Sequence, residues 1–308
     1  MKNKTNIALL SVILIITCLF SAGCDNNNSV SVQSEQTFPA FAMGTVTETA
    51  EPSEYPVYIN ETEIKEKPER VVSLSPSLTE IIFEMGYGDK LVGRSAYCNY
   101  PEAVSGITEV GKPSQPDIDT IIGLSPNIIF TATAIPNKDI IALRNSGIET
   151  VYIAAPRSLE EMKGIYYATA LVFEGAFNAE SVSEKAWKTI SDIMPTEKSL
   201  GKYIYITEGM NIAGKGTLED SVLSLYGENL AKDIYGYTFE KEFLLENEPD
   251  VIIFDSQFTV EVLSSDEIIG KLTAFTNGDI LSLDNSYFER PTGRITELFY
   301  SLENLNKS

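Results

Sequence analysis

Between Arg70 and the C-terminus, short apolar runs rich in β-branched residues alternate with amphipathic segments of helical spacing. The first pair is RVVSLS followed by SLTEIIFEMGYG, a pattern that predicts a strand, a Ser-Pro turn and a helix. Strands that are apolar on both faces and separated by helices are typical of parallel sheets covered by helices. The sequence therefore predicts an α/β fold.

The alternation occurs in two rounds, and two helical segments without a strand between them separate the rounds. The first segment is SLEEMKGIYYATALVF, with an apolar face that includes Tyr166 and Phe173, and the second runs from Phe177 to Met194. After Pro195 the alternation resumes with KYIYIT. We expect an N-terminal α/β lobe, a helical connection that contains an interlobe helix, and a C-terminal α/β lobe, at residues 54–157, 158–195 (the interlobe helix at about 177–194) and 196–308.

The first 23 residues have the pattern of a secretory signal. Two lysines precede an apolar run from Ile7 to Phe20, which is too short to predict a membrane span. The following SAGC resembles the lipobox of bacterial lipoproteins, in which the signal is cut before a cysteine that then carries lipid, although Ser21 replaces the usual leucine. We expect residues 1–23 to be a lipoprotein signal peptide and Cys24 to anchor the protein to the cell membrane from outside the cytoplasm. Ordinary cleavage with an unmodified Cys24 is the alternative.

The composition of the remaining chain limits its partners. Residues 24–53 are rich in Ser, Thr, Asn and Glu without a sustained period, which predicts a disordered tether. The net charge of −21 repels nucleic acid. Cys98 is the only cysteine beyond the signal and the expected lipid site, so no intramolecular disulfide can form. We expect a monomer without nucleic-acid partners.

Signals for catalysis are weak. The chain contains no histidine, which argues against a zinc site and leaves Cys98 without a base to activate it. The stretch EGMNIAGKGT fits the G-x4-G-K pattern of a phosphate-binding loop, but Gly216 stands where a Ser or Thr would ligate the metal. No pattern singles out two carboxylates as an acid and a base. We therefore expect a protein that is not an enzyme, with no catalytic residue, no metal site and no cofactor of its own.

Two acidic residues occupy matching positions in the two rounds. Asp119 in DTIIGLSPNIIF and Glu242 in EFLLENEPDVIIF each start a helical segment, which ends near Pro126 or Pro249 and leads into a buried strand. The helix dipole stabilises an acid in the first helical turn by about 0.3 to 1 kcal/mol, so helix capping explains each acid taken singly. Capping does not explain why both lobes carry one at the same position.

From about Tyr55 to the C-terminus, several ordered blocks resemble the substrate-binding proteins of ABC importers for vitamin B12, haem and ferric siderophores. The blocks are PERVVSLSPSLTEIIFEMGYGDKLVG, YCNYPEAVSGITEVGKPSQPDIDTIIGLSPNIIF, GKGTLEDSVLSLYGENLAKD, EPDVIIF and YFERPTGRITELFYSL. The resemblance implies two Rossmann-like lobes with parallel-rich central sheets, joined by a single long helix, with the ligand in a cleft between the lobes. It also implies that one acid on each lobe docks onto arginines of the permease, by position Asp119 and Glu242; helix capping alone stays the alternative.

The resemblance also implies which residues line the cleft. Tyr97 and Tyr287 match aromatic positions of the B12 binders, and Arg290 matches a cleft arginine. A core position for Tyr97 and a surface ion pair between Arg290 and Glu289 are the alternatives.

Other candidate cleft residues depart from the B12 pattern or follow from position alone. Pro113, Ser114 and Thr133 stand where the B12 binders carry tryptophans, a departure that reduces the stacking surface for a corrin ring. Ser75 and Ser77 follow the first strand, where serine is also a common helix cap. The remaining candidates by position are Asn211, Tyr235 and Tyr237.

Together these features predict an extracytoplasmic lipoprotein that captures a corrinoid or a ferric siderophore and delivers it to an ABC permease with a cytoplasmic ATPase. Cobalt or iron would then be held by the ligand and not by the protein. The alternative is a surface-anchored ligand-binding or sensing protein of the same fold that takes no part in transport.

Overall fold

Residues 53–305 are described by the computed structural model. The predicted signal peptide, the lipidation site Cys24 and nearly all of the predicted tether lie outside the described residues. Among residues 53–305, no helix combines the length and the apolar character that a membrane span requires.

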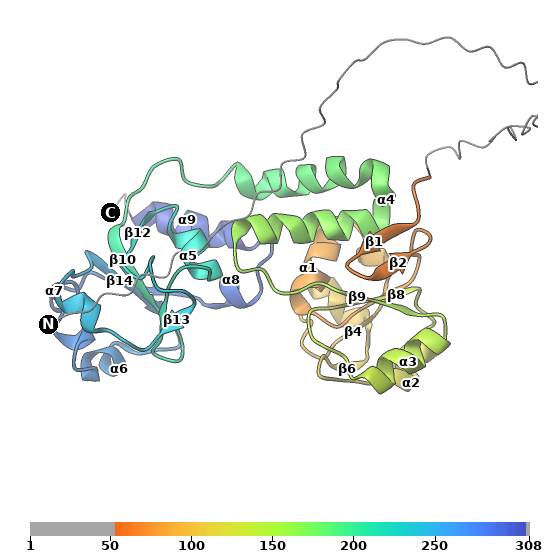
Figure 1. Cartoon of the computed structure of the whole chain (residues 1–308), viewed down its shortest axis with the longest axis horizontal. Coiled ribbons are helices and arrows are strands. Elements are labelled where there is room, and N and C mark those ends of the chain that lie inside the picture. Colours follow the sequence, from red (N-terminus) through yellow and green to blue (C-terminus); the bar gives the residue numbers. More distant parts are fainter. Residues whose placement is uncertain (1–52, 306–308) are drawn as a thin grey trace, which may run out of the picture. The chain divides into compact units, whose positions relative to one another are not determined.

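A five-stranded parallel sheet in the order β5-β4-β3-β8-β9 forms the centre of the N-terminal lobe (Figure 1). Its strands are β3 (Val71–Ser73), β4 (Leu91–Arg94), β5 (Thr108–Glu109), β8 (Ile128–Thr131) and β9 (Glu149–Tyr152). Its helices are α1 (Pro76–Glu84), α2 (Ile118–Leu124) and α3 (Asn137–Asn145). All residues of β3 and β8 are buried, as expected for strands covered on both faces.

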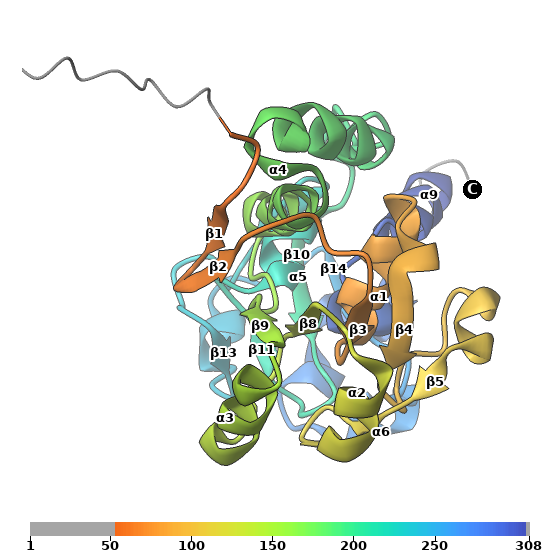
Figure 2. The same cartoon turned by 90° about the vertical axis from the view of Figure 1, so that its right-hand side faces the viewer.

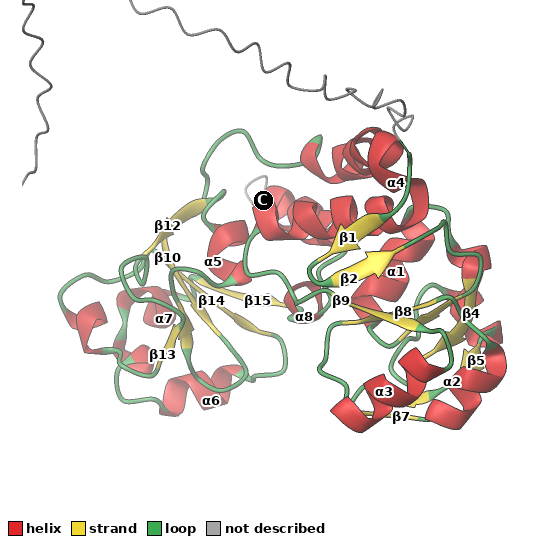
Figure 3. Ribbon diagram, turned by 45° about the vertical axis from the view of Figure 1, so that its right-hand side comes forward, coloured by secondary structure: helices red, strands yellow, loops and turns green. Residues whose placement is uncertain are grey.

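The C-terminal lobe contains a mixed sheet in the order β13-β11-β10-β14-β15, in which β12 also pairs with β10 (Figure 3). The parallel strands are β10 (Gly201–Ile206), β12 (Gly227–Asn229), β14 (Val251–Asp255) and β15 (Ile280–Leu283), and the antiparallel strands are β11 (Ile212–Ala213) and β13 (Tyr237–Thr238). The helices are α5 (Leu218–Leu223), α6 (Val260–Ser265), α7 (Thr273–Asn277), α8 (Ser286–Glu289) and α9 (Ile295–Leu305). The prediction of an α/β fold with parallel-rich sheets is confirmed.

The two sheets are connected by α4 (Leu159–Ser191), which folds back on itself at Gly175. Lys163 Nζ lies 2.6 Å from Glu184 Oε1, whereas residues 21 positions apart on a straight helix would be separated by roughly 31 Å. Figures 1 and 2 accordingly show two green helical arms side by side. The sequence prediction of two consecutive helical segments is confirmed. The second arm, residues 176–191, ends three residues before the predicted Met194.

The segment that precedes the first sheet is bound to the turn of α4. The Ala176 N–H donates to the carbonyl of Glu54 at 3.0 Å, and the Tyr55 hydroxyl donates to the carbonyl of Val172 at 3.0 Å. The hairpin of β1 (Val57–Ile59) and β2 (Thr62–Ile64) follows. Because the hydroxyl of Thr62 donates to the carbonyl of Thr150 in β9, the hairpin covers one edge of the first sheet.

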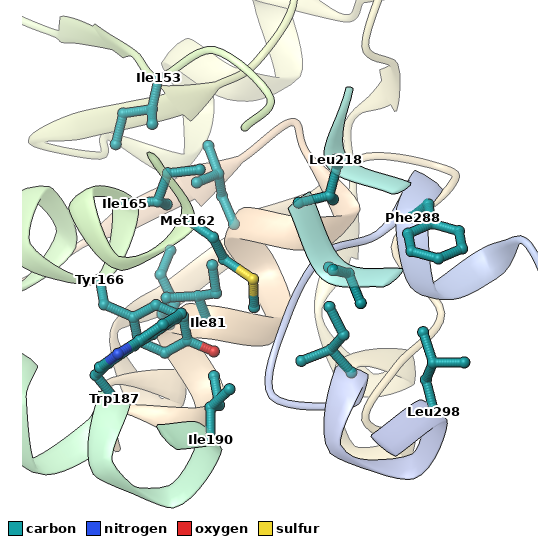
Figure 4. Close-up of a cluster of buried hydrophobic side chains, with 14 of the residues drawn as sticks. Ile81, Ile153, Met162, Ile165, Tyr166, Trp187, Ile190, Leu218, Phe288 and Leu298 are labelled. Atoms are coloured by element: carbon teal, nitrogen blue, oxygen red, sulfur yellow. The ribbon is translucent and has the colours of Figure 1, made fainter. Parts of the chain in front are cut away.

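One apolar cluster contains residues of both sheets, of α4 and of α9; we call it the shared core. Tyr166 and Trp187 face each other from the two arms of α4, with ring centroids 5.8 Å apart. Figure 4 shows them in the same cluster as Ile81 of α1, Leu218 of α5 and Leu298 of α9. Each lobe also has a smaller apolar cluster of its own, around Ile129 in the first sheet and Ile252 in the second. The lobes are therefore joined by packing as well as by the chain.

Candidate functional site

A cavity of about 430 Å³ lies at the carboxyl ends of β10 and β15 in the C-terminal lobe. Loops at this edge of a parallel sheet are where α/β proteins bind ligands. The cavity is lined by Thr207, Glu208, Gly209, Asn211, Glu219, Tyr237, Asn285, Phe288 and Glu289. Two predicted cleft residues, Asn211 and Tyr237, are among them.

Glu219 is the most unusual residue of this cavity, because its side chain is charged and the residue is only 6% exposed. Its carboxylate accepts hydrogen bonds from the Tyr237 hydroxyl, which lies 3.1 Å from both oxygens. Burial raises the pKa of Glu219 above the ordinary range for a glutamate. We did not predict this residue from the sequence. The signal available was an acid at the start of an apolar helical segment, LEDSVL, whose neighbours Leu218 and Val222 are buried.

A second cavity, of about 620 Å³, lies at the carboxyl ends of β8 and β9 in the N-terminal lobe. Thr133, a predicted cleft residue, is one of its lining residues, together with Thr131, Asn137 and Tyr152. The Thr131 hydroxyl donates to the carbonyl of Thr133 at 2.7 Å and so fixes the loop that follows β8. Each lobe therefore has a hollow at the edge where its parallel strands end.

The predicted residues Tyr97 and Arg290 belong to two segments that the fold brings together. Arg290 Nη1 donates to Asn99 Oδ1 at 2.7 Å, two residues from Tyr97. The guanidinium of Arg294 lies 4.9 Å from the ring centroid of Tyr100 in the same loop. Tyr97 is 50% exposed, which excludes the alternative of a core tyrosine. The contact that fixes Arg290 is with Asn99 and not with Glu289.

The other predicted cleft residues line neither cavity. Ser75 is buried, and its hydroxyl accepts from the Leu78 N–H at 3.5 Å as the cap of α1, which favours the capping alternative. Ser77 is half-buried in the first turn of α1. Pro113 and Ser114 form the turn between β6 (Gly111–Lys112) and β7 (Gln115–Pro116). Tyr235 is 72% exposed, and the Tyr287 hydroxyl donates to Glu297 at 3.2 Å.

The two predicted docking acids are both exposed. Asp119 lies in the first turn of α2, whose actual cap is Asp117, since the Asp117 carboxylate accepts from the Thr120 N–H. Glu242 lies in a 3-10 turn, η3 (Glu242–Leu245), so the longer helix expected before Pro249 was wrong. The segments lead into β8 and β14, each of which pairs with the first strand of its own sheet. The equivalence of the two positions therefore extends to the topology of the sheets.

The near match to a phosphate-binding loop does not form one. Strand β11 interrupts the stretch and pairs with β10 and β13. Lys215 is exposed and forms an isolated bridge with Tyr235, while Thr217 caps α5 through its own hydroxyl. The glycines of this stretch therefore lie on either side of a strand and not in one continuous loop.

Two glutamates of α1 contact the segment that precedes α9, a feature that the sequence analysis missed. Glu80, only 1% exposed, accepts from the Thr292 hydroxyl at 2.9 Å, and the Arg294 guanidinium lies 3.8 Å from its other oxygen. Glu84 accepts from the Gly293 N–H at 3.0 Å. These contacts join residues more than 200 positions apart in the sequence, so no local pattern could reveal them.

Glu80 gives the protein a pH-dependent stability. Burial raises the pKa of its carboxyl group above the ordinary value of 4.5, so its contribution favours the folded state at low pH and is lost as the pH rises from 4.5 through the raised value. We expect the free energy of unfolding of the Glu80→Gln variant to fall less over that range than that of the unchanged protein. Urea denaturation at several pH values measures this, with Glu102→Gln as an exposed control. Identical slopes for all three proteins would contradict it.

Known proteins similar to this chain include members of the class that the sequence resembles. The "Cobalamin-binding protein" of Halobacterium salinarum is 24% identical over 252 residues, which cover 75% of this chain and 67% of that protein. The "Uncharacterized ABC transporter substrate-binding lipoprotein YvrC" of Bacillus subtilis is 23% identical over 305 residues, or 92% of each chain. These relatives share the predicted class of this chain over most of its length.

A solved structure gives the same fold. The crystal structure of a possible iron-binding periplasmic solute-binding protein from Staphylococcus epidermidis aligns with a TM-score of 0.66 and 22% identity, covering 78% of this chain and 98% of that one. The family model described as "Periplasmic binding protein" matches residues 71–287, from β3 of the N-terminal sheet into α8 of the C-terminal lobe. Since the match spans both sheets and α4, the chain belongs to the periplasmic binding protein family.

Proposed function

We propose that this protein is an extracytoplasmic substrate-binding lipoprotein that captures a corrinoid or a ferric siderophore and delivers it to an ABC permease. The observation that carries the proposal is the family match across both sheets, with relatives that are named cobalamin-binding protein and ABC transporter substrate-binding lipoprotein. The hollows at the carboxyl ends of the two sheets supply surfaces on which a ligand can lie.

The proposed ligand site combines residues of both lobes. Thr133 contributes from the N-terminal lobe, and Asn211 and Tyr237 contribute from the C-terminal lobe. Tyr97 offers an exposed aromatic face. Arg290 offers a fixed array of donors beside it, because its guanidinium is already oriented by Asn99.

The proposed docking contacts are Asp119 and Glu242. Both side chains are free to meet a partner because both are exposed, and they precede equivalent strands in the two sheets. A two-point contact between opposite charges steers a transient partner into one orientation and weakens with salt. Such a contact suits a carrier that must release the permease after each delivery.

A ligand screen of the purified protein tests the proposal. Thermal-shift and calorimetric titrations with cobinamide, cyanocobalamin, haemin and ferric siderophores are expected to give saturable binding and a higher unfolding temperature for at least one of the corrinoids or siderophores. If no corrinoid and no siderophore binds, the proposal is wrong. Binding without any effect of gene deletion on cellular uptake would favour the sensing alternative.

A further inference from the structure

The cavity of the C-terminal lobe carries information about the chemistry of its ligand. Three of its nine lining residues, Glu208, Glu219 and Glu289, are acidic, and none is basic. Asn211 and Asn285 add amide oxygens, and Phe288 adds an apolar wall. The lining is therefore rich in groups that accept hydrogen bonds and attract positive charge.

The Glu219 carboxylate can accept further hydrogen bonds. It has two oxygens with about four acceptor positions. The Tyr237 hydroxyl lies 3.1 Å from both oxygens, and the Thr217 hydroxyl and the Glu219 N–H also act on the carboxylate. A buried carboxylate costs free energy unless it is paired or fully hydrogen-bonded. A ligand group that enters the cavity and donates to Glu219 would remove this cost. The ligand would then bind more tightly by the same free energy.

A second buried acid lies close to the same wall. Asp255, at the end of β14, is completely buried, and its Oδ2 has no hydrogen-bond partner among the described residues. The negative charge of Asp255 contributes, after burial, to the raised pKa of Tyr205, whose hydroxyl donates to the cavity residue Asn285 at 3.0 Å. Glu219 and Glu289 act on the same tyrosine. Three acids, Asp255, Glu219 and Glu289, therefore act on one tyrosine beside this cavity.

The carboxylates of this cavity are not arranged to bind a metal ion. Within residues 53–305, no group of three acidic or cysteine side chains is placed so that it could hold a metal ion. Organic donors fit the cavity better, because N–H groups spread over a ligand can reach acceptors that are distributed around a wall.

We propose that this cavity receives a part of the ligand that donates N–H hydrogen bonds, an amide or ammonium group, and that Glu219 determines this specificity. The inference rests on the proposed function and narrows it. Corrinoids, with peripheral amides, and hydroxamate siderophores with a free ammonium group meet the requirement. Ligands that would present carboxylates or catecholates to Glu219, such as haem and ferric enterobactin, would be repelled by it.

Calorimetric titration of the purified protein with cobinamide, ferrioxamine B, haemin and ferric enterobactin tests the inference. We expect cobinamide or ferrioxamine B to bind at least about tenfold more tightly than the two anionic ligands, and Glu219→Gln to weaken that binding by about tenfold or more. Glu246→Gln makes the same change of charge at an exposed residue outside the cavity and should have no effect.

The outcomes separate this inference from the proposed function. If cobinamide binds equally well to the unchanged protein and to the Glu219→Gln variant, the role of Glu219 is wrong and the proposed function stands. If haemin or ferric enterobactin binds most tightly, the inferred ligand class is wrong. If no ligand binds, both are wrong. Should Glu219→Gln fail to fold in a thermal-unfolding control, Glu208→Gln, an exposed residue of the same cavity, carries the test with the same expected direction.

Discussion

Replacing both Asp119 and Glu242 with lysine is expected to reduce ligand uptake by cells to background while the purified protein keeps its affinity for the ligand. Both acids are exposed, and neither lines the cavities described here. The double replacement would turn the two proposed attractive contacts with permease arginines into repulsive ones, and like charges placed together at an interface cost several kcal/mol. Uptake of radiolabelled ligand and calorimetric affinity are the two measurements.

Single replacements test whether each acid contributes separately, and a matched control tests the effect of the change in net charge. Asp119→Lys or Glu242→Lys alone should reduce uptake by roughly tenfold, because one of the two contacts survives. The pair Glu102→Lys and Glu246→Lys makes the same overall change of charge at exposed acids outside the proposed dock. Normal uptake by the Asp119→Lys, Glu242→Lys protein would exclude the docking role. A loss of ligand affinity in that protein would place the acids in the binding site instead.

Replacing Gly175 with valine should lower the free energy of unfolding by about 3 kcal/mol or more. Gly175 has φ 67° and ψ −175°, a conformation that is essentially restricted to glycine. A Cβ atom there would lie 2.6 Å from the carbonyl oxygen of Glu54 and 3.1 Å from the ring of Tyr55. The valine would therefore both strain the turn of α4 and displace the segment that is bound to it. Urea denaturation followed by circular dichroism measures the loss.

Gly164 supplies the control for this substitution. It lies on the first arm of α4, and a Cβ atom added there meets nothing within 4 Å. Gly164→Ala should stabilise the helix by up to about 1 kcal/mol, because alanine restricts the unfolded chain more than glycine does. If both substitutions change the stability by the same amount, the backbone conformation of Gly175 is not essential to the turn.

The sequence predicted the parts of this protein that local periodicity controls. The strands around Ile129 and Ile253 and the two arms of α4 show uninterrupted apolar or helical patterns, and the structure has elements at these positions. The match between Asp119 and Glu242 was visible as a repeat of one local pattern. The length of the second segment was not, because Leu244 is the single buried residue of η3 and provides too little apolar surface for a longer helix.

The candidate site could be predicted only in part. Asn211 and Tyr237 were predicted by position and Thr133 from the family resemblance, and all three line the cavities described above. Glu219 was missed because an acid in the first turn of a helix is ordinary in sequence, and its burial arises from β13, which folds over it from residues 237–238. Contacts that depend on long-range packing leave no signal in a short window.

The shared core limits how the two lobes can separate. Its members come from α1, α4, α5 and α9, so pulling the sheets apart would expose apolar side chains on both sides. At about 25 cal/mol per Å², each ~100 Å² of apolar surface exposed by such a movement would cost about 2.5 kcal/mol. The shared core therefore opposes wide separation of the lobes, and we expect a ligand to enter and leave by the displacement of surface side chains and loops.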